Sequence, residues 1–364
     1  MLAPLRDYLC PQDLRTSPLL CTIKDHYFGR LRLFGDLEPD QPGFEQSRWI
    51  RLEDVNVEHL LNVFASFDTI SGDVWAACAD FMAHLRWHKP RSTVLGPRVE
   101  ELPDDHHSKP RCLFELSLLL GSLGNYVDKK RLLTCVLELE RGRGDDDMVA
   151  RTLRELGEAN RMLHLYTEGI QRSKEALEIW ERLGNVEGQA MCWNSLGWSL
   201  FKDNQREAAE EAGSRAINLF RGQHREYWVC GSHRLLGHIY QPKGERGETV
   251  QHFEAAIGIA SAFDWHHHLF WARLALAELF CNKTESNKAQ FHIEQAKLHA
   301  TGDKYKLGRA MDRQAGIWYH QGRLDEAKAE ILCALETFEK LGATADLPRA
   351  VFRHQRIERA IERR

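Results

Sequence analysis

Small side chains recur along the chain at a nearly constant interval. Successive members of this series are 40, 40, 40, 40 and 38 residues apart. The series consists of Ser117, Gly157, Gly197, Gly237, Ala277 and Ala315. A second series follows 19 residues behind the first and consists of Val136, Ala176, Ala216, Ala256, Ala296 and Ala334. Two series that keep one spacing over roughly 220 residues predict a tandem repeat.

Each repeat is predicted to form two helices. In the third repeat, Trp193, Leu196 and Leu200 fall on one helical face, and Ala212 marks the buried face of the next helix. The polar segment 202–204 separates the two. Because no segment shows sustained period-two alternation, we expect an all-α fold, a right-handed α-solenoid of about six helical hairpins. The small residues would let neighbouring helices approach closely.

Residues 1–109 lack the repeat and are predicted to be a partly helical region. Apolar residues at helical spacing predict helices over 55–66 and 73–87, which would form a hairpin under the first repeat. The stretch 89–111 contains four prolines and is expected to be an extended connector. The opening fifty residues follow no pattern that assigns them a structure.

The repeat array is expected to span residues 110–342, with a C-terminal capping helix within 343–364. A solenoid needs such a cap because its last repeat leaves an apolar face uncovered. A basic stripe on this helix is expected to face solvent and consists of Arg349, Arg353, Arg356, Arg359 and Arg363. The stripe could instead contact phosphate, but Glu358 and Glu362 interleave with it and favour the cap.

Four short segments resemble the tetratricopeptide repeat. Trp193–Leu200 (W-x2-L-G-x2-L) and Leu236–Tyr240 (L-G-x2-Y) are similar to its W-x2-L-G-x2-Y pattern. Ala289–Ile293 and Ala327–Ile331 (both A-x3-I) are similar to its A-x3-F pattern. The period of this chain is about 40 residues rather than 34, and the family's proline between repeats is missing. The superhelical pitch of the 34-residue repeat family is therefore not assigned to this chain. The resemblance implies that the first helix of each hairpin lines a concave groove.

A narrower resemblance covers essentially the whole chain. It is carried by Asp7–Pro11, Ser17–Tyr27, Glu53–Leu61, Trp87–Arg91 and Leu102–His106. These segments look like the part of fungal (basidiomycete) NACHT/NB-ARC-type NOD-like receptors that follows their ATPase domain. The resemblance implies a sensor or binding module. Because this chain contains no ATPase, it would be a detached module, a truncated gene product, or a partner of a NACHT/NB-ARC ATPase acting in trans.

Charge and cysteine usage narrow the class of partner and the compartment. The chain has 364 residues, with 49 Lys and Arg against 53 Asp and Glu, a formal net charge of −4. This balance disfavours nucleic acid and an anionic membrane as partners. The first residues lack a basic stretch followed by an apolar run, and the nine cysteines form no C-x-x-C pair. We therefore expect a cytoplasmic protein.

Motifs for chemistry are missing from the sequence. It contains no G-x-x-x-x-G-K-[ST], G-x-S-x-G or H-E-x-x-H string. We expect no catalytic, cofactor-binding or metal-binding residues, no cofactor, and no enzyme activity. The histidines at 106–107 and 266–268 are assigned to solvated turns, and the aspartates at 145–147 to the N-terminus of a helix that starts near Met148.

The groove that the repeat geometry implies supplies the candidate site. Side chains three residues before, one after and four after each small residue would form three rows along it. The candidate residues are Arg154, Glu158, Arg161, Asn194, Trp198, Phe201, Arg234, His238, Glu278 and Asp312. Large aromatics beside arginines are typical of binding hot spots. The alternative is that Trp198 packs between repeats.

Three functional hypotheses remain open at this point. The first is a non-catalytic scaffold or sensor that binds a protein or peptide of unknown identity in the groove. The second is small-molecule or nucleic-acid sensing by the same superhelix within a NOD-like signalling system. The third, an enzyme, lacks any motif that supports it.

Overall fold

The computed structural model describes residues 18–34, 48–67, 72–88, 93–282, 284–300 and 302–364. Within these ranges there are 17 α-helices, one short 3₁₀ helix and no strand, which confirms the all-α prediction. The chain divides into two compact units. The first contains residues 1–122 and 131–144, and the second contains residues 123–130 and 145–364.

The first unit is built around one central helix. Helix α3 contacts α1, α2 and α5, and its Trp75 and Phe81 side chains are fully buried. The helices of this unit are α1 (Pro18–Phe34), α2 (Arg48–Phe67), α3 (Gly72–His88), α4 (Leu95–Glu100), α5 (Lys109–Ser122) and most of α6 (Tyr126–Arg143). The two predicted N-terminal helices are confirmed as α2 and α3, each longer than expected.

In the N-terminal region one helix was not predicted and one expectation was wrong. The opening residues include a helix, α1, although the sequence offered no pattern for it. The stretch 89–111 is not wholly an extended connector, because it contains α4 and the start of α5. Pro97 and Pro110 lie within the first turns of α4 and α5, where a missing N–H breaks no intrahelical hydrogen bond.

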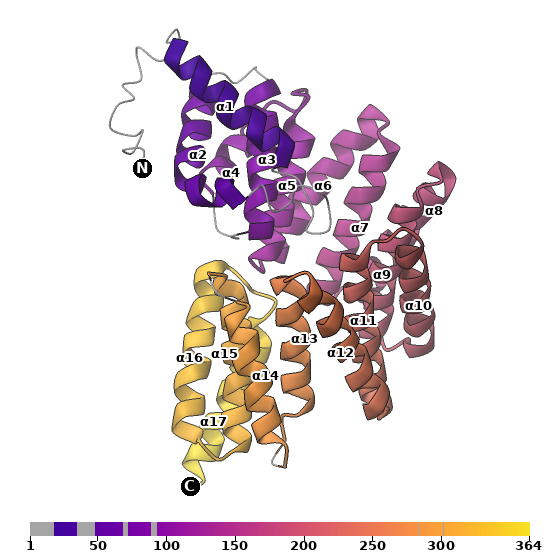
Figure 1. Ribbon diagram of the computed structural model, residues 1–364, viewed down its shortest axis with the longest axis vertical. Coiled ribbons are helices and arrows are strands. Elements are labelled where there is room, and N and C mark those ends of the chain that lie inside the picture. The colour runs from indigo at the N-terminus through magenta and orange to yellow at the C-terminus, as the bar shows by residue number, and fades with distance from the viewer. Residues whose placement is uncertain (1–17, 35–47, 68–71, 89–92, 283, 301) are drawn as a thin grey trace. The chain divides into compact units, whose positions relative to one another are not determined.

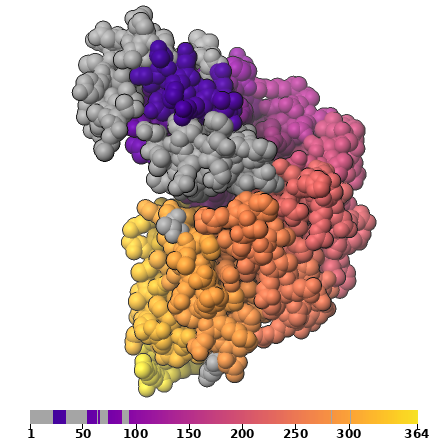
Figure 2. All heavy atoms as spheres, viewed as in Figure 1, coloured from indigo at the N-terminus to yellow at the C-terminus, as the bar shows by residue number. Residues whose placement is uncertain are grey.

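The second unit is an array of helical hairpins closed by a final helix (Figure 1). Each hairpin packs its two helices together, and it packs on the next hairpin. The helices are α7 (Asp146–Met162), α8 (Tyr166–Leu183), α9 (Val186–Lys202), α10 (Arg206–Gly222), α11 (Glu226–Tyr240), α12 (Arg246–Ala262), α13 (His266–Leu279), α14 (Ser286–Leu298), α15 (Lys304–His320), α16 (Leu324–Leu341) and the capping helix α17 (Leu347–Glu362). In the space-filling view the repeats follow one another in chain order (Figure 2).

The two series of small residues lie where helices approach each other closely. A Cβ at Gly157 would lie 2.7 Å from Ser173 Oγ in the same hairpin, and one at Gly197 would lie 2.7 Å from the Leu235 side chain of the next hairpin. All six residues of the second series are completely buried. A larger side chain at these positions would push the helices apart.

The first helices of successive hairpins form a continuous layer. Helix α7 contacts α9, α9 contacts α11, and the series continues through α13 and α15 to α17. We call these six helices the first-helix layer. The carboxylate of Asp145 accepts a 3.0 Å hydrogen bond from the Met148 amide at the start of α7, which confirms the predicted helix N-terminus.

The start of α6 belongs to the second unit. Gly124 has a positive φ of 83°, and a Cβ there would lie 2.5 Å from the Tyr305 ring. Lys129 donates hydrogen bonds to Glu155 and Glu158 of α7. This short segment therefore contacts both the first hairpin and the last hairpin of the unit.

Candidate functional site

All ten candidate residues lie on the first-helix layer. Arg154, Glu158 and Arg161 come from α7, and Asn194, Trp198 and Phe201 come from α9. Arg234 and His238 come from α11, Glu278 from α13 and Asp312 from α15. The structure brings several of these residues together across helices, but it gives them different environments.

An aromatic cluster joins α7, α9 and α11. The Trp198 ring lies 6.4 Å from the Phe201 ring and 5.4 Å from the His238 ring, centroid to centroid. The Arg161 guanidinium lies 5.6 Å from the centroid of Trp198. Trp198 and Phe201 also pack against a buried cluster between the repeats that includes Leu235. Both remain partly exposed, so Trp198 packs between repeats and still presents surface.

His238 is held in its neutral form. Desolvation between α11 and its neighbours lowers the pKa of His238 to about 3. The ring stacks edge-on against Phe253, at a centroid distance of 5.0 Å. At neutral pH this residue therefore acts as an aromatic side chain that can also form a hydrogen bond.

Arg234 is a partly buried cation that forms no ion pair with a carboxylate of the described residues. Its guanidinium lies 5.9 Å from the centroid of Trp271, and its Nη1 lies 3.4 Å from Nδ1 of His268. Within the described residues, no Asp or Glu forms an ion pair with it, and its Nε has no hydrogen-bond partner. Desolvation lowers the pKa of Arg234 to about 10.

Two further cations of this layer, Lys202 and Arg309, are not among the predicted residues. Lys202, next to Phe201, is exposed, and its Nζ lies 5.2 Å from that ring. Desolvation first, and repulsion from Arg161 second, lower the pKa of Lys202. Arg309 lies 5.0 Å from the Trp271 centroid. A search for basic residues one turn away from the three predicted rows would have found both.

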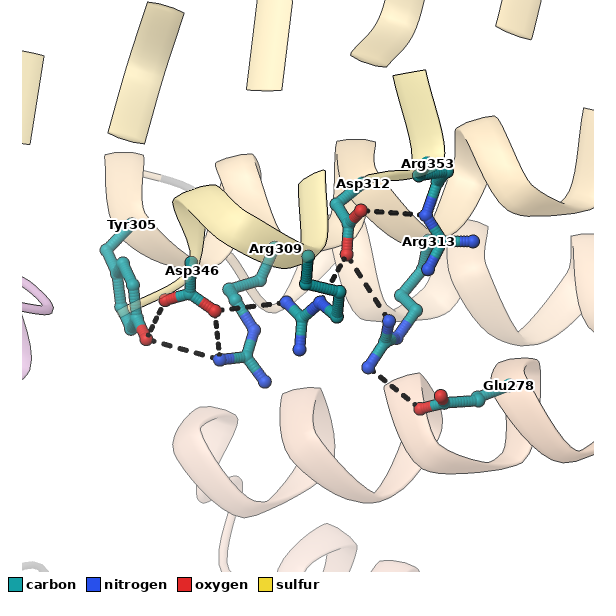
Figure 3. Close-up of polar contacts among 8 residues, drawn as sticks. Glu278, Tyr305, Arg309, Asp312, Arg313, Asp346 and Arg353 are labelled. Atoms are coloured by element: carbon teal, nitrogen blue, oxygen red, sulfur yellow. Dashed lines mark hydrogen bonds and ion pairs between the residues drawn. The ribbon is translucent and has the colours of Figure 1, made fainter. Parts of the chain in front are cut away.

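Asp312 is the centre of an ion-pair network at the C-terminal end of the array (Figure 3). It is completely buried, and it accepts hydrogen bonds from Arg353 Nε at 2.8 Å and Arg349 Nε at 3.1 Å. Arg313 joins Asp312 to Glu278, with a distance of 3.0 Å between Arg313 Nη2 and Glu278 Oε2. Asp312 therefore anchors the capping helix.

A second carboxylate extends the same network. Asp346 accepts hydrogen bonds from Arg309 at 2.8 Å, Arg349 at 3.0 Å and the Tyr305 hydroxyl at 2.8 Å. The prediction that all arginines of the capping helix face solvent was therefore wrong for Arg349 and Arg353. Both side chains bind buried Asp312, which lies more than 30 residues earlier in the chain, and Arg349 also binds Asp346 at the start of α17. The acidic residues that interleave with the arginines of α17 do not indicate these contacts.

Other candidate residues are occupied by internal contacts. Arg154 pairs with Glu155, and Asn194 accepts a 3.3 Å hydrogen bond from the Ser232 hydroxyl. Glu155 is buried, which opposes ionisation, but Arg154 and Lys129 lower its pKa below the usual range. The Asn194 contact joins α9 to α11, and the contacts of Glu155 lie within α7 and between α6 and α7.

The histidine run at 266–268 differs in part from the expectation. His266 and His267 are exposed, but His268 is buried, with its ring 4.2 Å from the Tyr227 centroid. The assignment to a solvated turn was therefore wrong for His268, because the run begins helix α13 and its third residue faces α11. No group of three or more His, Cys, Asp or Glu residues in the described part of the chain is arranged to hold a metal ion.

Residues 148–222 match the tetratricopeptide repeat. They cover two successive hairpins, α7 to α10. This match supports the resemblance that the sequence motifs carried.

No curated protein sequence matches the chain. Among the helices that the structure describes, not one has both the length and the apolar character needed to cross a membrane.

Solved structures with a similar fold include several Rap proteins. A Rap protein in complex with competence and sporulation factor is 13% identical, with a TM-score of 0.59 over 96% of this chain and 100% of that chain. The apo form of RapI is 11% identical, with a TM-score of 0.54 over 78% and 98%. The Rap conjugation gene regulator of plasmid pLS20, in complex with the Phr peptide, is 11% identical, with a TM-score of 0.51 over 94% and 97%. At these identities the likeness concerns the fold alone.

Proposed function

We propose that the second unit is a non-catalytic scaffold or sensor that binds a peptide or protein segment on its first-helix layer. One observation carries this proposal: Arg161, Trp198, Phe201 and His238 form an aromatic cluster that is still partly exposed. Aromatic side chains beside arginine dominate the binding energy of many interfaces. The solved Rap complexes with competence and sporulation factor and with the Phr peptide, which share the fold, support the same function.

The test uses a random-peptide library selected on the full chain, followed by affinity measurements on the enriched peptides. Trp198→Ala is expected to weaken binding by about tenfold or more, because hot-spot aromatics typically contribute over 1 kcal/mol. Trp193→Ala is the matched control. It lies on the same helix, but its ring stacks with Arg215 of α10 at 4.7 Å. Equal losses for both variants, or none for Trp198→Ala, would refute the assignment.

A small molecule or nucleic acid on the same face is the competing candidate, supported by the cations of the layer. Binding of an oligonucleotide that falls steeply with added salt would favour it. The resemblance to NACHT/NB-ARC receptors supports an ATPase partner in trans and a sensor role. Co-purification of such an ATPase with the full chain is the test. Parts of that resemblance, at residues 7–11, 17 and 89–91, lie outside the described residues.

A cytoplasmic location belongs to the same proposal. The seven cysteines that the structure describes are all free thiols. Free, dispersed thiols are typical of a reducing compartment.

A further inference from the structure

The first-helix layer carries an excess of positive charge, although the chain as a whole has a net charge of −4. Electrostatic interactions link eleven charged residues on the layer or at its helix ends. The cations are Arg161, Lys202, Arg234, Arg309, Arg313, Arg349 and Arg353. The carboxylates are Glu158, Glu278, Asp312 and Asp346. Among these eleven residues the cations outnumber the carboxylates by three.

The excess is concentrated on three side chains. Arg309, Arg313, Arg349 and Arg353 share the carboxylates of the network around Asp312 (Figure 3). Among the described residues, Arg161 forms an ion pair only with Glu158, at 3.8 Å, and Glu158 also accepts a hydrogen bond from Lys129. Neither Lys202 nor Arg234 pairs with any carboxylate that the structure describes.

The three cations belong to three successive first helices and interact with one another. Arg161 of α7 repels both Lys202 of α9 and Arg234 of α11. Arg234 is partly buried, and desolvation by neighbouring side chains lowers the pKa of both Lys202 and Arg234. An entering carboxylate would relieve the repulsion and accept charged hydrogen bonds from these side chains.

We propose that the first-helix layer binds an acidic peptide segment, whose carboxylates pair with Arg161, Lys202 and Arg234 while its apolar side chains contact Trp198 and Trp271. This inference rests on the proposed function and adds the chemistry of the partner. Both tryptophans lie beside these cations: Arg161 stacks on Trp198, and Arg234 stacks on Trp271. The surface thus offers aromatic and cationic contacts side by side.

A peptide fits this surface better than a long polyanion does. Four carboxylates lie among the seven cations, and they would repel a continuous phosphate backbone. The net negative charge of the chain also opposes the approach of nucleic acid. Discrete carboxylates on a flexible segment can pair with Arg161, Lys202 and Arg234 and avoid the acids between them.

The experiment measures the composition and the charge dependence of peptides selected on the full chain. We expect enrichment in Asp and Glu. Replacing these residues by Asn and Gln should weaken binding by roughly 10- to 100-fold, as expected for a charged hydrogen bond. Arg234→Gln should weaken binding of the acidic peptide and remove the affinity difference between it and its Asn/Gln version. Arg234→Lys, which keeps the charge, should retain most of that difference.

Arg215→Gln is the control. Arg215 is an exposed arginine on α10 that pairs with Glu211, and the variant should bind like the wild type. Neutral or basic peptides that still depend on Trp198 would overturn the acidic partner and leave the proposed function standing. Acidic peptides unaffected by Arg234→Gln, or displaced by a single-stranded oligonucleotide at equal concentration, would also overturn it. If no peptide binds, both proposals fail.

Discussion

Asp312 offers the sharpest test of how the array is closed. Its carboxylate is completely buried and holds Arg349 and Arg353 of the capping helix α17, together with Arg313 of its own helix. Burial alone would raise the pKa of Asp312, but Arg349 and Arg353 lower it. The variant Asp312→Ala would remove the carboxylate that these arginines share, leaving Asp346 for Arg349 and Glu278 for Arg313.

The expected cost follows from the burial of the pair. Removing one partner of a buried ion pair typically costs about 3–5 kcal/mol. We expect the lower part of that range, because the Arg349 and Arg353 side chains are 36% and 24% exposed and can turn toward water. A loss of about 3 kcal/mol changes an opening equilibrium by roughly two orders of magnitude. The effect should be largest in α17, since terminal elements of a repeat array open first.

Hydrogen exchange of the α17 amides is the assay. Exchange there should be about a hundredfold faster in Asp312→Ala than in the wild type, while α9 changes little. Asp325→Ala is the matched control. Asp325 also pairs with an arginine of the C-terminal segment, Arg364, at 3.5 Å, but both side chains are exposed. Exposed pairs contribute about 0–1 kcal/mol. If the two variants accelerate exchange equally, Asp312 does not anchor the cap and the reasoning is wrong.

Two further predictions concern the second unit. Because the pKa of His238 is about 3 in the folded chain and 6.5 ordinarily, the unfolded state binds the extra proton below pH 6.5. Stability should therefore fall by about 2 kcal/mol between pH 6.5 and 4.5 from this residue alone, and urea titrations of His238→Gln should lack that part of the slope; an unchanged slope would contradict the cause. Gly124→Ala should lower the melting temperature more than Gly144→Ala does. Both glycines have positive φ, at 83° and 75°, but only at Gly124 would the new Cβ strike Tyr305, so we expect about 1–3 kcal/mol of additional destabilisation there. Equal shifts would mean that the backbone conformation alone matters.

The sequence predicted the architecture of the array well because packing distance depends on side-chain size. Glycine and alanine at a fixed period are needed wherever two helices approach closely, as Gly157 and Gly197 do. The helix start at Asp145 was also predictable, since a cap involves only residues three positions apart. Helix α1, by contrast, was missed because its residues showed no clear periodic pattern.

The candidate site was predictable only as a face. Periodicity placed Arg161, Trp198 and Arg234 on the first helices, but it contained no information on which charges would pair. That choice depends on contacts across one or more repeats: Asp312 meets arginines 37 and 41 residues further along the chain, while Arg234 meets no carboxylate in the described structure.

The sequence by itself thus determined the repeat, the helical faces and the positions where helices touch, because these depend on spacing and side-chain volume. Only the tertiary structure decided which cations are neutralised and which remain available. Ion pairing depends on the three-dimensional register between distant helices, and that register left Arg161, Lys202 and Arg234 as the excess positive charge of the layer.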